Sequence, residues 1–351
     1  MTVLQKMCSY CISVKVYYDT AIDFYRGFMD IHYLLFLQNV RDKLPDAISR
    51  CMMLVSDIDL IMRYAIPLVL FWCLSKEGGV FVSFAQGFSG VLNQLLKNTF
   101  CIYRPWIRSE EIMPYRNAKL TATGYSFPSG HSQIASSVYG GTAFYYRRNR
   151  ALFIAMIFMT LLTGFSRNYL GCHTPQDVCV GLLEGAVFVI FTHYLTKWLS
   201  KDERRDTWVL IGGVVFALAM IFYAEFKPYP VDYIDGKIIV DPEKMKIDCF
   251  GSGGFLIGIV LGWFLERRFV RFEIAGVWWK KVIRAIVGIS IAILMYVGLG
   301  TFFYTVGLHE KMIACMLEFI LELYILFIGS LVITVIRKLF RTKPCDWKSN
   351  S

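Results

Sequence analysis

The sequence predicts an all-α fold, a polytopic helical bundle embedded in a membrane. Of its 351 residues, 56% are hydrophobic and 18% are charged, and the mean hydropathy is +0.49. A soluble domain has fewer apolar residues and more charged ones. Apolar runs close to the length that crosses a bilayer recur from about residue 58 to residue 337. Together these observations exclude a soluble globular domain.

Residues 1–57 contain no convincing span. The apolar stretch from Ile31 to Val40 is shorter than a bilayer crossing, and the charged residues Arg41, Asp42 and Lys43 follow it. We expect an interfacial helix or a buried stub at this stretch, within an interfacial or amphipathic N-terminal segment.

Nine apolar segments are then expected to cross the membrane as helices. They cover about residues 58–75, 78–97, 130–146, 151–167, 175–197, 207–225, 249–265, 284–305 and 312–336. The third is rich in Gly, Ala and Ser, which allow close packing of helices in a membrane. The chain therefore divides into a segment at 1–57, a core at 58–225, an outward-facing loop at 226–248, and additional transmembrane helices with a basic cytoplasmic tail at 249–351.

The distribution of basic residues predicts the orientation. Lys and Arg concentrate in the 147–150 and 266–284 connections and in the tail after residue 336. These three regions share one side if the nine segments alternate, and an excess of Lys and Arg marks the cytoplasmic side. This bias also accounts for the net charge of +10 without a nucleic-acid partner. The 98–129 and 168–174 connections then face the extracytoplasmic or lumenal side.

Three polar stretches fall on this outward side, each at the end of a span. They read KNTFCIYRP after the second span, PSGH before the third and SRNYLGCHTPQD after the fourth. Their candidate functional residues are Lys97 and Arg104 in the first stretch, Ser129, Gly130 and His131 in the second, and Ser166, Arg167, His173 and Asp177 in the third. Because successive spans run in opposite directions, all three stretches reach one face of the membrane.

The residue types predict a phosphate site. A phosphate monoester carries nearly two negative charges at neutral pH. Arg104 and Arg167 can each bind two of its oxygens, and Lys97 adds a point charge. Ser129 and the backbone N–H groups around Gly130 could donate further hydrogen bonds at the start of the third helix.

The histidines predict the reaction steps. A histidine with a neighbouring carboxylate is a standard nucleophile, and His173 and Asp177 share one face at the start of a helix because they are four residues apart. Asp177 could hold the imidazole in one tautomer and stabilise its charge. His131, on a separate segment, is placed to protonate the leaving alkoxide.

Each of these residues also has a purely structural interpretation. Lys97 and Arg104 could anchor span ends at the headgroups, and Arg167 could extend its charge to the membrane surface. Ser129 and Asp177 could be ordinary helix caps. We favour the phosphate-site hypothesis because these interpretations would otherwise have to coincide on one membrane face.

The set K-x6-RP, PSGH and SR-x5-H-x3-D resembles the three-part signature of the type 2 phosphatidic acid phosphatase superfamily. The resemblance covers about residues 58–200, with no departure at a signature position. It implies a helical-bundle phosphatase core, which we take to have six helices, a phosphohistidine intermediate, and no metal or other cofactor. The apolar runs after residue 248 add about three C-terminal spans to this core. The roles that it implies are nucleophile for His173, its partner for Asp177, general acid for His131, and phosphate binding for Lys97, Arg104, Ser129, Gly130 and Arg167.

The superfamily acts on several substrate classes. A phosphorylated lipid is favoured because it can reach a site at the membrane surface laterally between helices. We therefore expect a phosphatase acting on a phosphatidate-, sphingoid- or polyprenyl-phosphate-like lipid. The alternatives are a sugar-phosphate phosphatase of the glucose-6-phosphatase type, and a non-catalytic lipid transporter or scramblase. The presence of both His131 and His173 argues against a non-catalytic relative.

Overall fold

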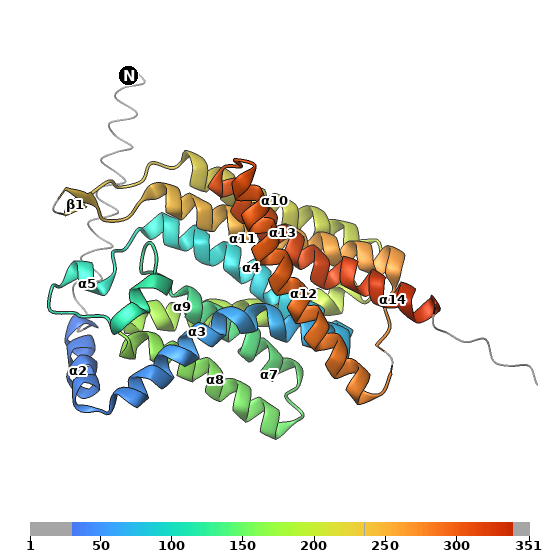
Figure 1. Ribbon diagram of the computed structural model, residues 1–351, viewed down its shortest axis with the longest axis horizontal. Coiled ribbons are helices and arrows are strands. Elements are labelled where there is room, and N and C mark those ends of the chain that lie inside the picture. The colour runs from blue at the N-terminus through green and yellow to red at the C-terminus, as the bar shows by residue number, and fades with distance from the viewer. Residues whose placement is uncertain (1–29, 235, 275, 340–351) are drawn as a thin grey trace, which may run out of the picture.

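A computed structural model describes residues 30–234, 236–274 and 276–339, which form a bundle of long helices (Figure 1). The helices are α2 (Asp30–Lys43), α3 (Asp46–Val69), α4 (Lys76–Phe100), α5 (Pro105–Arg108), α6 (Gly130–Ala135), α7 (Gly141–Tyr145), α8 (Arg150–Tyr169), α9 (Pro175–Leu199), α10 (Arg205–Phe226), α11 (Pro242–Leu265), α12 (Trp278–Thr305), α13 (Glu310–Leu323) and α14 (Gly329–Leu339). Short π-helical turns occur at Leu70–Leu74, Ser136–Gly140, Glu266–Val270 and Tyr324–Ile328, and a 3-10 turn at Arg116–Thr121. Two-residue strands β1 (Tyr233–Ile234) and β2 (Lys237–Ile238) pair as a hairpin. The all-α prediction is confirmed.

Within the described residues, six helical segments are long and apolar enough to cross a membrane. They are Arg150–Tyr169, Pro175–Leu199, Arg205–Phe226, Pro242–Val270, Trp278–Thr305 and Glu310–Leu339. The protein is therefore an integral multi-pass membrane protein, as the sequence predicts. The third predicted span corresponds to α6, the π-helical turn at Ser136–Gly140, and α7.

Helix α3 begins at Asp46, earlier than the predicted start of the first span at about residue 58. The reason is that the first half of α3 carries polar residues on a face that other parts of the protein cover. Ser49, Ser56 and Asp59 are all buried against other parts of the protein. Hydropathy alone cannot recognise a polar helix face that is covered by protein.

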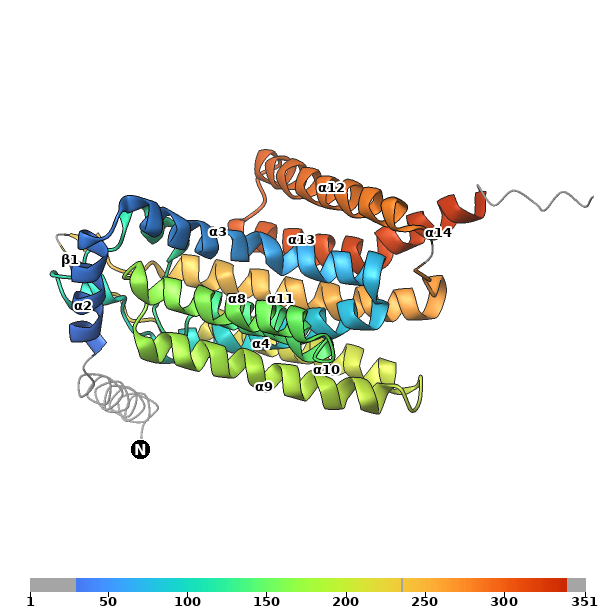
Figure 2. The ribbon, with the colours of Figure 1, turned by 90° about the horizontal axis from the view of Figure 1, so that it is seen from below.

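The stretch from Ile31 to Val40 lies in α2, which crosses one end of the bundle (Figure 2). Leu34 and Leu37 are buried, and the Arg41 side chain donates to the carbonyl oxygen of Met113 at 2.8 Å. Helix α2 is thus tied to the connections at this end. Residues 1–29 of the predicted N-terminal segment and residues 340–351 of the predicted tail lie outside the described residues.

The two ends of the bundle carry different connections (Figure 2). One end holds α2, α5 and β1, together with the α8–α9 junction. The opposite end holds the α7–α8, α9–α10 and α11–α12 connections. The three polar stretches that the sequence singled out therefore lie together at one end, and the basic 147–150 and 266–277 connections lie at the other.

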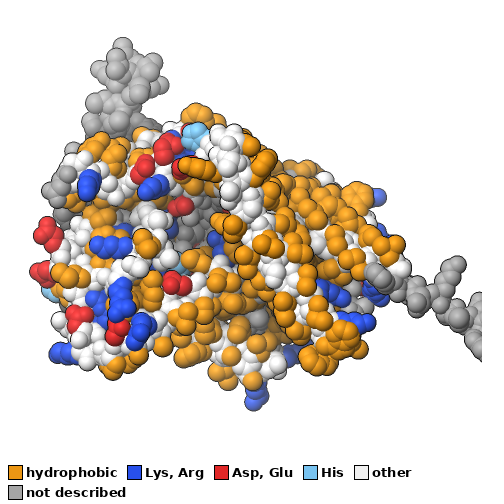
Figure 3. Space-filling model, in the orientation of Figure 1, with side chains coloured by type: hydrophobic (Ala, Val, Ile, Leu, Met, Phe, Trp, Pro, Cys, Tyr) orange, Lys and Arg blue, Asp and Glu red, His pale blue; other side chains and the backbone are white. Residues whose placement is uncertain are grey.

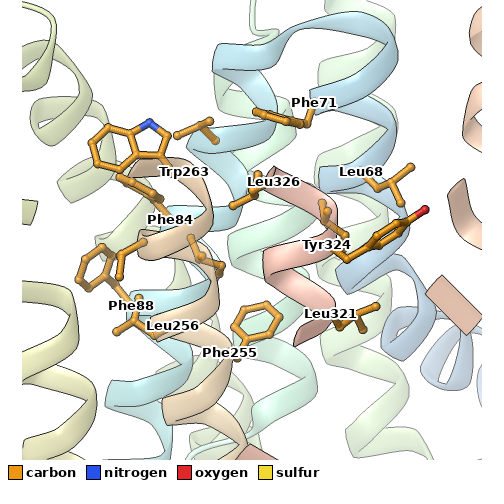
Figure 4. Packing of buried hydrophobic residues seen from close by; sticks show 14 of the residues in the cluster. Leu68, Phe71, Phe84, Phe88, Phe255, Leu256, Trp263, Leu321, Tyr324 and Leu326 are labelled. Carbon is orange, nitrogen blue, oxygen red and sulfur yellow. The ribbon is translucent and has the colours of Figure 1, made fainter. Parts of the chain in front are cut away.

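The C-terminal helices pack tightly against the first part of the bundle through α11. A Cβ on Gly254 would lie 2.1 Å from the carbonyl oxygen of Cys315, and one on Gly258 would lie 2.6 Å from that of Phe319. Only glycine permits α13 to approach this closely. Trp263 of α11 contacts Phe84 of α4, with 5.0 Å between the ring centroids (Figure 4). Both rings belong to the hydrophobic core that joins the C-terminal helices to the first part of the bundle.

Candidate active site

His173 and Arg104 are in direct contact, although they come from different polar stretches. Arg104 Nη1 lies 2.7 Å from His173 Nε2. The rest of the guanidinium is held by backbone carbonyl groups: Nε donates to Gly124 at 3.1 Å and Nη2 donates to Thr123 at 2.7 Å. A phosphoryl group attached to Nε2 would therefore lie beside the Arg104 guanidinium.

Asp177 lies on the other side of the His173 ring. Its Oδ2 is 3.5 Å from His173 Nδ1. The same oxygen accepts hydrogen bonds from the Thr174 backbone N–H at 2.8 Å and from the Ser126 hydroxyl at 2.6 Å. Thr174 and Asp177 form a capping box at the start of α9. Asp177 is thus a helix cap, and the cap itself fixes the carboxylate beside the imidazole.

The surroundings of His173 favour its neutral form. Burial, and after it the positive charges of Arg104, Arg167 and Lys97, lower the pKa of His173 well below its usual range. A neutral imidazole has a lone pair on one ring nitrogen, which a nucleophile requires. Burial also lowers the pKa of Arg104, to about 10, so its guanidinium remains charged at neutral pH.

The PSGH stretch is fixed to the start of α9. The backbone N–H of Ser129 donates to the Asp177 carbonyl oxygen at 3.0 Å. The Ser129 side chain caps α6 by accepting from the Ser132 N–H at 3.3 Å. On α9, a Cβ on Gly181 would lie 2.4 Å from the Ser129 carbonyl oxygen, so glycine allows α6 to approach. The structural interpretation of Ser129 as a cap therefore holds, and the cap lies within the site.

Lys97 and Gly130 are neighbours. A Cβ on Gly130 would lie 3.8 Å from Lys97 Nζ and 3.6 Å from Asn93 Oδ1. Lys97 is buried near the end of α4, where its amine faces the start of α6. Asn93 in turn donates to Glu184 of α9 at 2.9 Å. These contacts bring the first and second polar stretches together.

Arg167 is fully buried, with 0% of its surface exposed. Its Nη1 donates to the Ser56 hydroxyl of α3. Among the described residues, neither its Nε nor its Nη2 has a hydrogen-bond partner. Unsatisfied buried donors are costly, and phosphate oxygens are suitable acceptors for them.

His131 lies at the start of α6, with 7% of its surface exposed. Its Nε2 is buried and has no hydrogen-bond partner in the part of the chain that the structure describes. His131 is within electrostatic range of His173 and Arg167. By contrast, the Ser166 hydroxyl donates to the Thr163 carbonyl oxygen of its own helix.

Three residues that support the site were not singled out in the sequence. Ser126 donates to Asp177, and Ser56 holds Arg167. The Asn168 side chain donates to the carbonyl oxygen of His173 at 2.9 Å and so fixes the turn that carries the imidazole. Ser126 and Asn168 lie within or beside the polar stretches, which is a weak signal. Ser56 carries no such signal, because it lies far from them in the sequence.

Relatives of this chain are similar over part of its length. A lipid A 1-phosphatase from Rhizobium johnstonii is 32% identical over 115 residues, which cover 32% of this chain and 46% of the relative. A phosphatidylglycerophosphatase B from Bacillus subtilis is 27% identical over 144 residues, covering 39% of this chain and 64% of the relative. A probable sphingosine-1-phosphate phosphatase from Dictyostelium discoideum is 23% identical over 224 residues, covering 58% and 53%. The chain thus spans about half to nearly two thirds of the length of these relatives.

No solved structure matches the chain. Two family descriptions match it in succession: the PAP2 superfamily over residues 78–201, and the PAP2 superfamily phosphatase, transmembrane extension, over residues 250–340. The first match contains all three polar stretches, and the second contains most of α11 and the helices after it. The chain belongs to the PAP2 superfamily and carries the transmembrane extension of that superfamily.

Proposed function

We propose that this protein is an integral-membrane phosphatase that hydrolyses a phosphate monoester or diphosphate of a lipid through a phosphohistidine intermediate. The observation that carries the proposal is the arrangement around His173: Arg104 lies 2.7 Å from Nε2 and the Asp177 carboxylate lies 3.5 Å from Nδ1. A buried neutral imidazole between a cation and a carboxylate is suited to attack a phosphorus atom. The relatives named above, all phosphatases by name, favour a phosphorylated lipid as the substrate class.

In the first step, the lone pair of His173 Nε2 attacks phosphorus, and the bond from phosphorus to the lipid oxygen breaks. His131 donates a proton to the departing oxygen. In the second step, a water molecule attacks phosphorus and gives its proton to His131. The phosphorus–nitrogen bond breaks, inorganic phosphate leaves and His173 is neutral again. Asp177 stabilises the positive charge on the imidazole during both steps.

The remaining residues of the site would hold the phosphoryl oxygens. Arg104 and Arg167 supply guanidinium N–H groups, and Lys97 supplies an ammonium group. The Gly130 backbone N–H and the Ser129 side chain add donors at the start of α6. Charge stabilisation by fixed donors in a buried site is worth more than the same contacts in water.

We further propose that the site faces the extracytoplasmic or lumenal side. The support is the excess of basic residues in connections that lie at the end of the bundle opposite the site (Figure 2). The 147–150 turn carries three arginines without an acid and lies at the end opposite the site. Such an excess of basic residues is typical of cytoplasmic loops.

The test is phosphate release by the purified full-length protein in detergent. The panel contains phosphatidate, sphingosine 1-phosphate, a polyprenyl diphosphate and glucose 6-phosphate. We expect release from at least one lipid and only background activity for His173→Ala. His309→Ala is the matched control, because His309 is an exposed histidine at the start of α13 and should leave activity unchanged.

Three results would contradict the proposal in whole or in part. Wild-type protein that releases phosphate from no member of the panel would favour the non-catalytic alternative of a lipid transporter or scramblase. Equal activity of the wild type and His173→Ala would rule out the phosphohistidine mechanism. Activity on glucose 6-phosphate alone would retain the mechanism but replace the lipid with a sugar phosphate as substrate.

A further inference from the structure

We propose that Asp248, on α11, selects the substrate at this site. Its carboxylate binds an ammonium or hydroxyl group on the carbon next to the phosphoester carbon of the substrate. The negative charge of the same carboxylate weakens the binding of diphosphates. The substrate class would then be lipid monophosphates with a hydrogen-bond donor beside the phosphoester. The inference rests on the proposed phosphatase function, which it refines.

The position of Asp248 follows first from Met245, one turn earlier on α11. Met245 is fully buried, and a Cβ on Gly124 would lie 2.2 Å from its sulfur. The carbonyl oxygen of Gly124 accepts the hydrogen bond from Arg104 Nε. This face of α11 therefore packs on the segment that holds Arg104. Asp248 lies three residues after Met245, on the same face of the helix.

A second contact places Asp248 near Lys97. The next residue, Cys249, is buried, and its sulfur accepts a hydrogen bond from the Asn98 side chain at 3.0 Å. Asn98 directly follows Lys97 on α4. The turn of α11 that carries Asp248 is thus fixed between the segment that holds Arg104 and the turn of α4 that carries Lys97.

The Asp248 carboxylate is close to the cations of the site without being paired to them. It interacts electrostatically with both Lys97 and Arg104. No hydrogen bond or ion pair engages it among residues 30–234, 236–274 and 276–339, and its side chain is only partly buried. Glu243, on the same helix, differs: it pairs with Lys246 at 2.9 Å and with Lys311 at 3.4 Å. Asp248 therefore retains its capacity to accept hydrogen bonds.

The surface is hollowed on the side where the C-terminal helices meet the first part of the bundle. Figure 3 shows this hollow, with basic and acidic side chains around it.

A carboxylate beside a phosphate site needs a chemical reason. It weakens the binding of any anion, because like charges repel. The cost is offset when the substrate presents a donor to the carboxylate, since hydrogen bonds to charged groups are the strong ones. An ammonium group would gain most, and a hydroxyl group would gain less. A diphosphate would bring further negative charge toward the same carboxylate.

The test compares alkyl phosphates of one chain length with the purified full-length protein. Three of the substrates are monophosphates that differ only at the carbon next to the phosphoester carbon: the first carries an amine there, the second a hydroxyl and the third only hydrogen. The fourth substrate is the diphosphate of the unsubstituted chain. We expect wild type to prefer the amine over the unsubstituted monophosphate in kcat/KM by roughly tenfold or more, the factor typical of a hydrogen bond to a charged group. Asp248→Asn should remove most of this preference and raise the kcat/KM of the diphosphate relative to the unsubstituted monophosphate.

Glu243→Gln is the matched control and should preserve both ratios, because Glu243 is an exposed acid on the same helix. If Asp248→Asn does not yield folded protein, Asp248→Ser is measured by the same criteria. Unchanged ratios would overturn the inference, and so would an equal loss on all four substrates, which would mean that Asp248 only positions the cations. In both cases wild-type turnover would leave the proposed function intact. Failure of the wild type to hydrolyse any phosphate would overturn the proposed function and, with it, this inference.

Discussion

At the scale of single residues, the site combines structural and chemical roles in the same side chains. Asp177 closes the capping box of α9 and lies behind His173. Ser129 caps α6, and its backbone N–H donates a hydrogen bond to the carbonyl oxygen of Asp177. A capping contact has narrow geometry and therefore helps to hold these groups in place, and Ser126 adds a further hydrogen bond to Asp177. The structural and functional interpretations of these residues are therefore compatible.

Asp177→Asn separates these two roles. The asparagine amide can still accept the hydrogen bond from the Thr174 N–H, so we expect helix capping and thermal stability to be largely retained. The negative charge behind His173 is lost, and kcat should fall on the order of a thousandfold, short of the background expected for His173→Ala. The measurements are turnover on the preferred lipid and the melting temperature in detergent. A variant with wild-type kcat would show that Asp177 is only a cap.

His131→Ala tests the proposed general acid through the leaving group. An alkoxide needs a proton to depart, whereas nitrophenolate leaves readily without one. We expect kcat/KM to fall by about a hundredfold or more on an alkyl phosphate, and by much less on nitrophenyl phosphate. Stopped assays of both substrates give the two ratios. An equal loss on the two substrates would contradict the assignment of His131.

At the scale of elements, α9 is the support on which the site is assembled. Its first turn supplies Thr174 and Asp177, and its glycines let α6 approach from the side. A Cβ on Gly181 would lie 2.4 Å from the Ser129 carbonyl oxygen. A Cβ on Gly185 would lie 2.8 Å from the Gln133 carbonyl oxygen. The distance between these two helices therefore decides where the PSGH stretch lies relative to His173.

Gly181→Ala should displace α6 because its Cβ would collide with a backbone atom that cannot rotate away. We expect a loss of stability of about 1–3 kcal/mol, the usual cost of overpacking, and a marked decrease in kcat. Gly212→Ala is the control, because no neighbouring atom of the described residues lies within 4 Å of a Cβ at that position on α10. Thermal melting and turnover of both variants provide the comparison. If Gly181→Ala matched Gly212→Ala in both, close approach of α6 and α9 would not matter for the site.

At the scale of the whole molecule, α11 links the two regions that match the superfamily. It packs on α4 through the shared core (Figure 4). It packs on α13 through its glycines. Its first turns reach the segments that carry Lys97 and Arg104. These first turns directly precede the part of the chain that matches the transmembrane extension, and α13 packs closely on the rest of α11.

The proposed orientation is tested by single cysteines at the two ends of the bundle. Asn117 and Asn149 are both exposed, the first at the site end and the second in the basic turn before α8. In a background whose ten native cysteines are replaced, Asn117→Cys should react with a membrane-impermeant maleimide on intact cells if the site is exposed at the cell surface. Asn149→Cys should react only after permeabilisation. The reverse pattern would place the site on the cytoplasmic side.

The sequence by itself determined the helical architecture and the candidate residues. Long apolar runs have few alternatives to membrane helices, because lipid offers no hydrogen-bond partners and a helix pairs its backbone polar groups within the segment. The three polar stretches could be identified because their residues are close together in the chain and of unusual type for their position. Alternation of the spans was then enough to predict that Lys97, His131 and His173 reach one end of the bundle.

Only the tertiary structure decided which groups meet at the site. The start of α3 at Asp46, the bond from Arg167 to Ser56, and the approach of Asp248 all depend on contacts between distant segments. A buried polar residue is tolerated when another helix supplies its partner, and hydropathy does not record that partner. The identities of the residues were local information, but their pairing followed from how the helices pack.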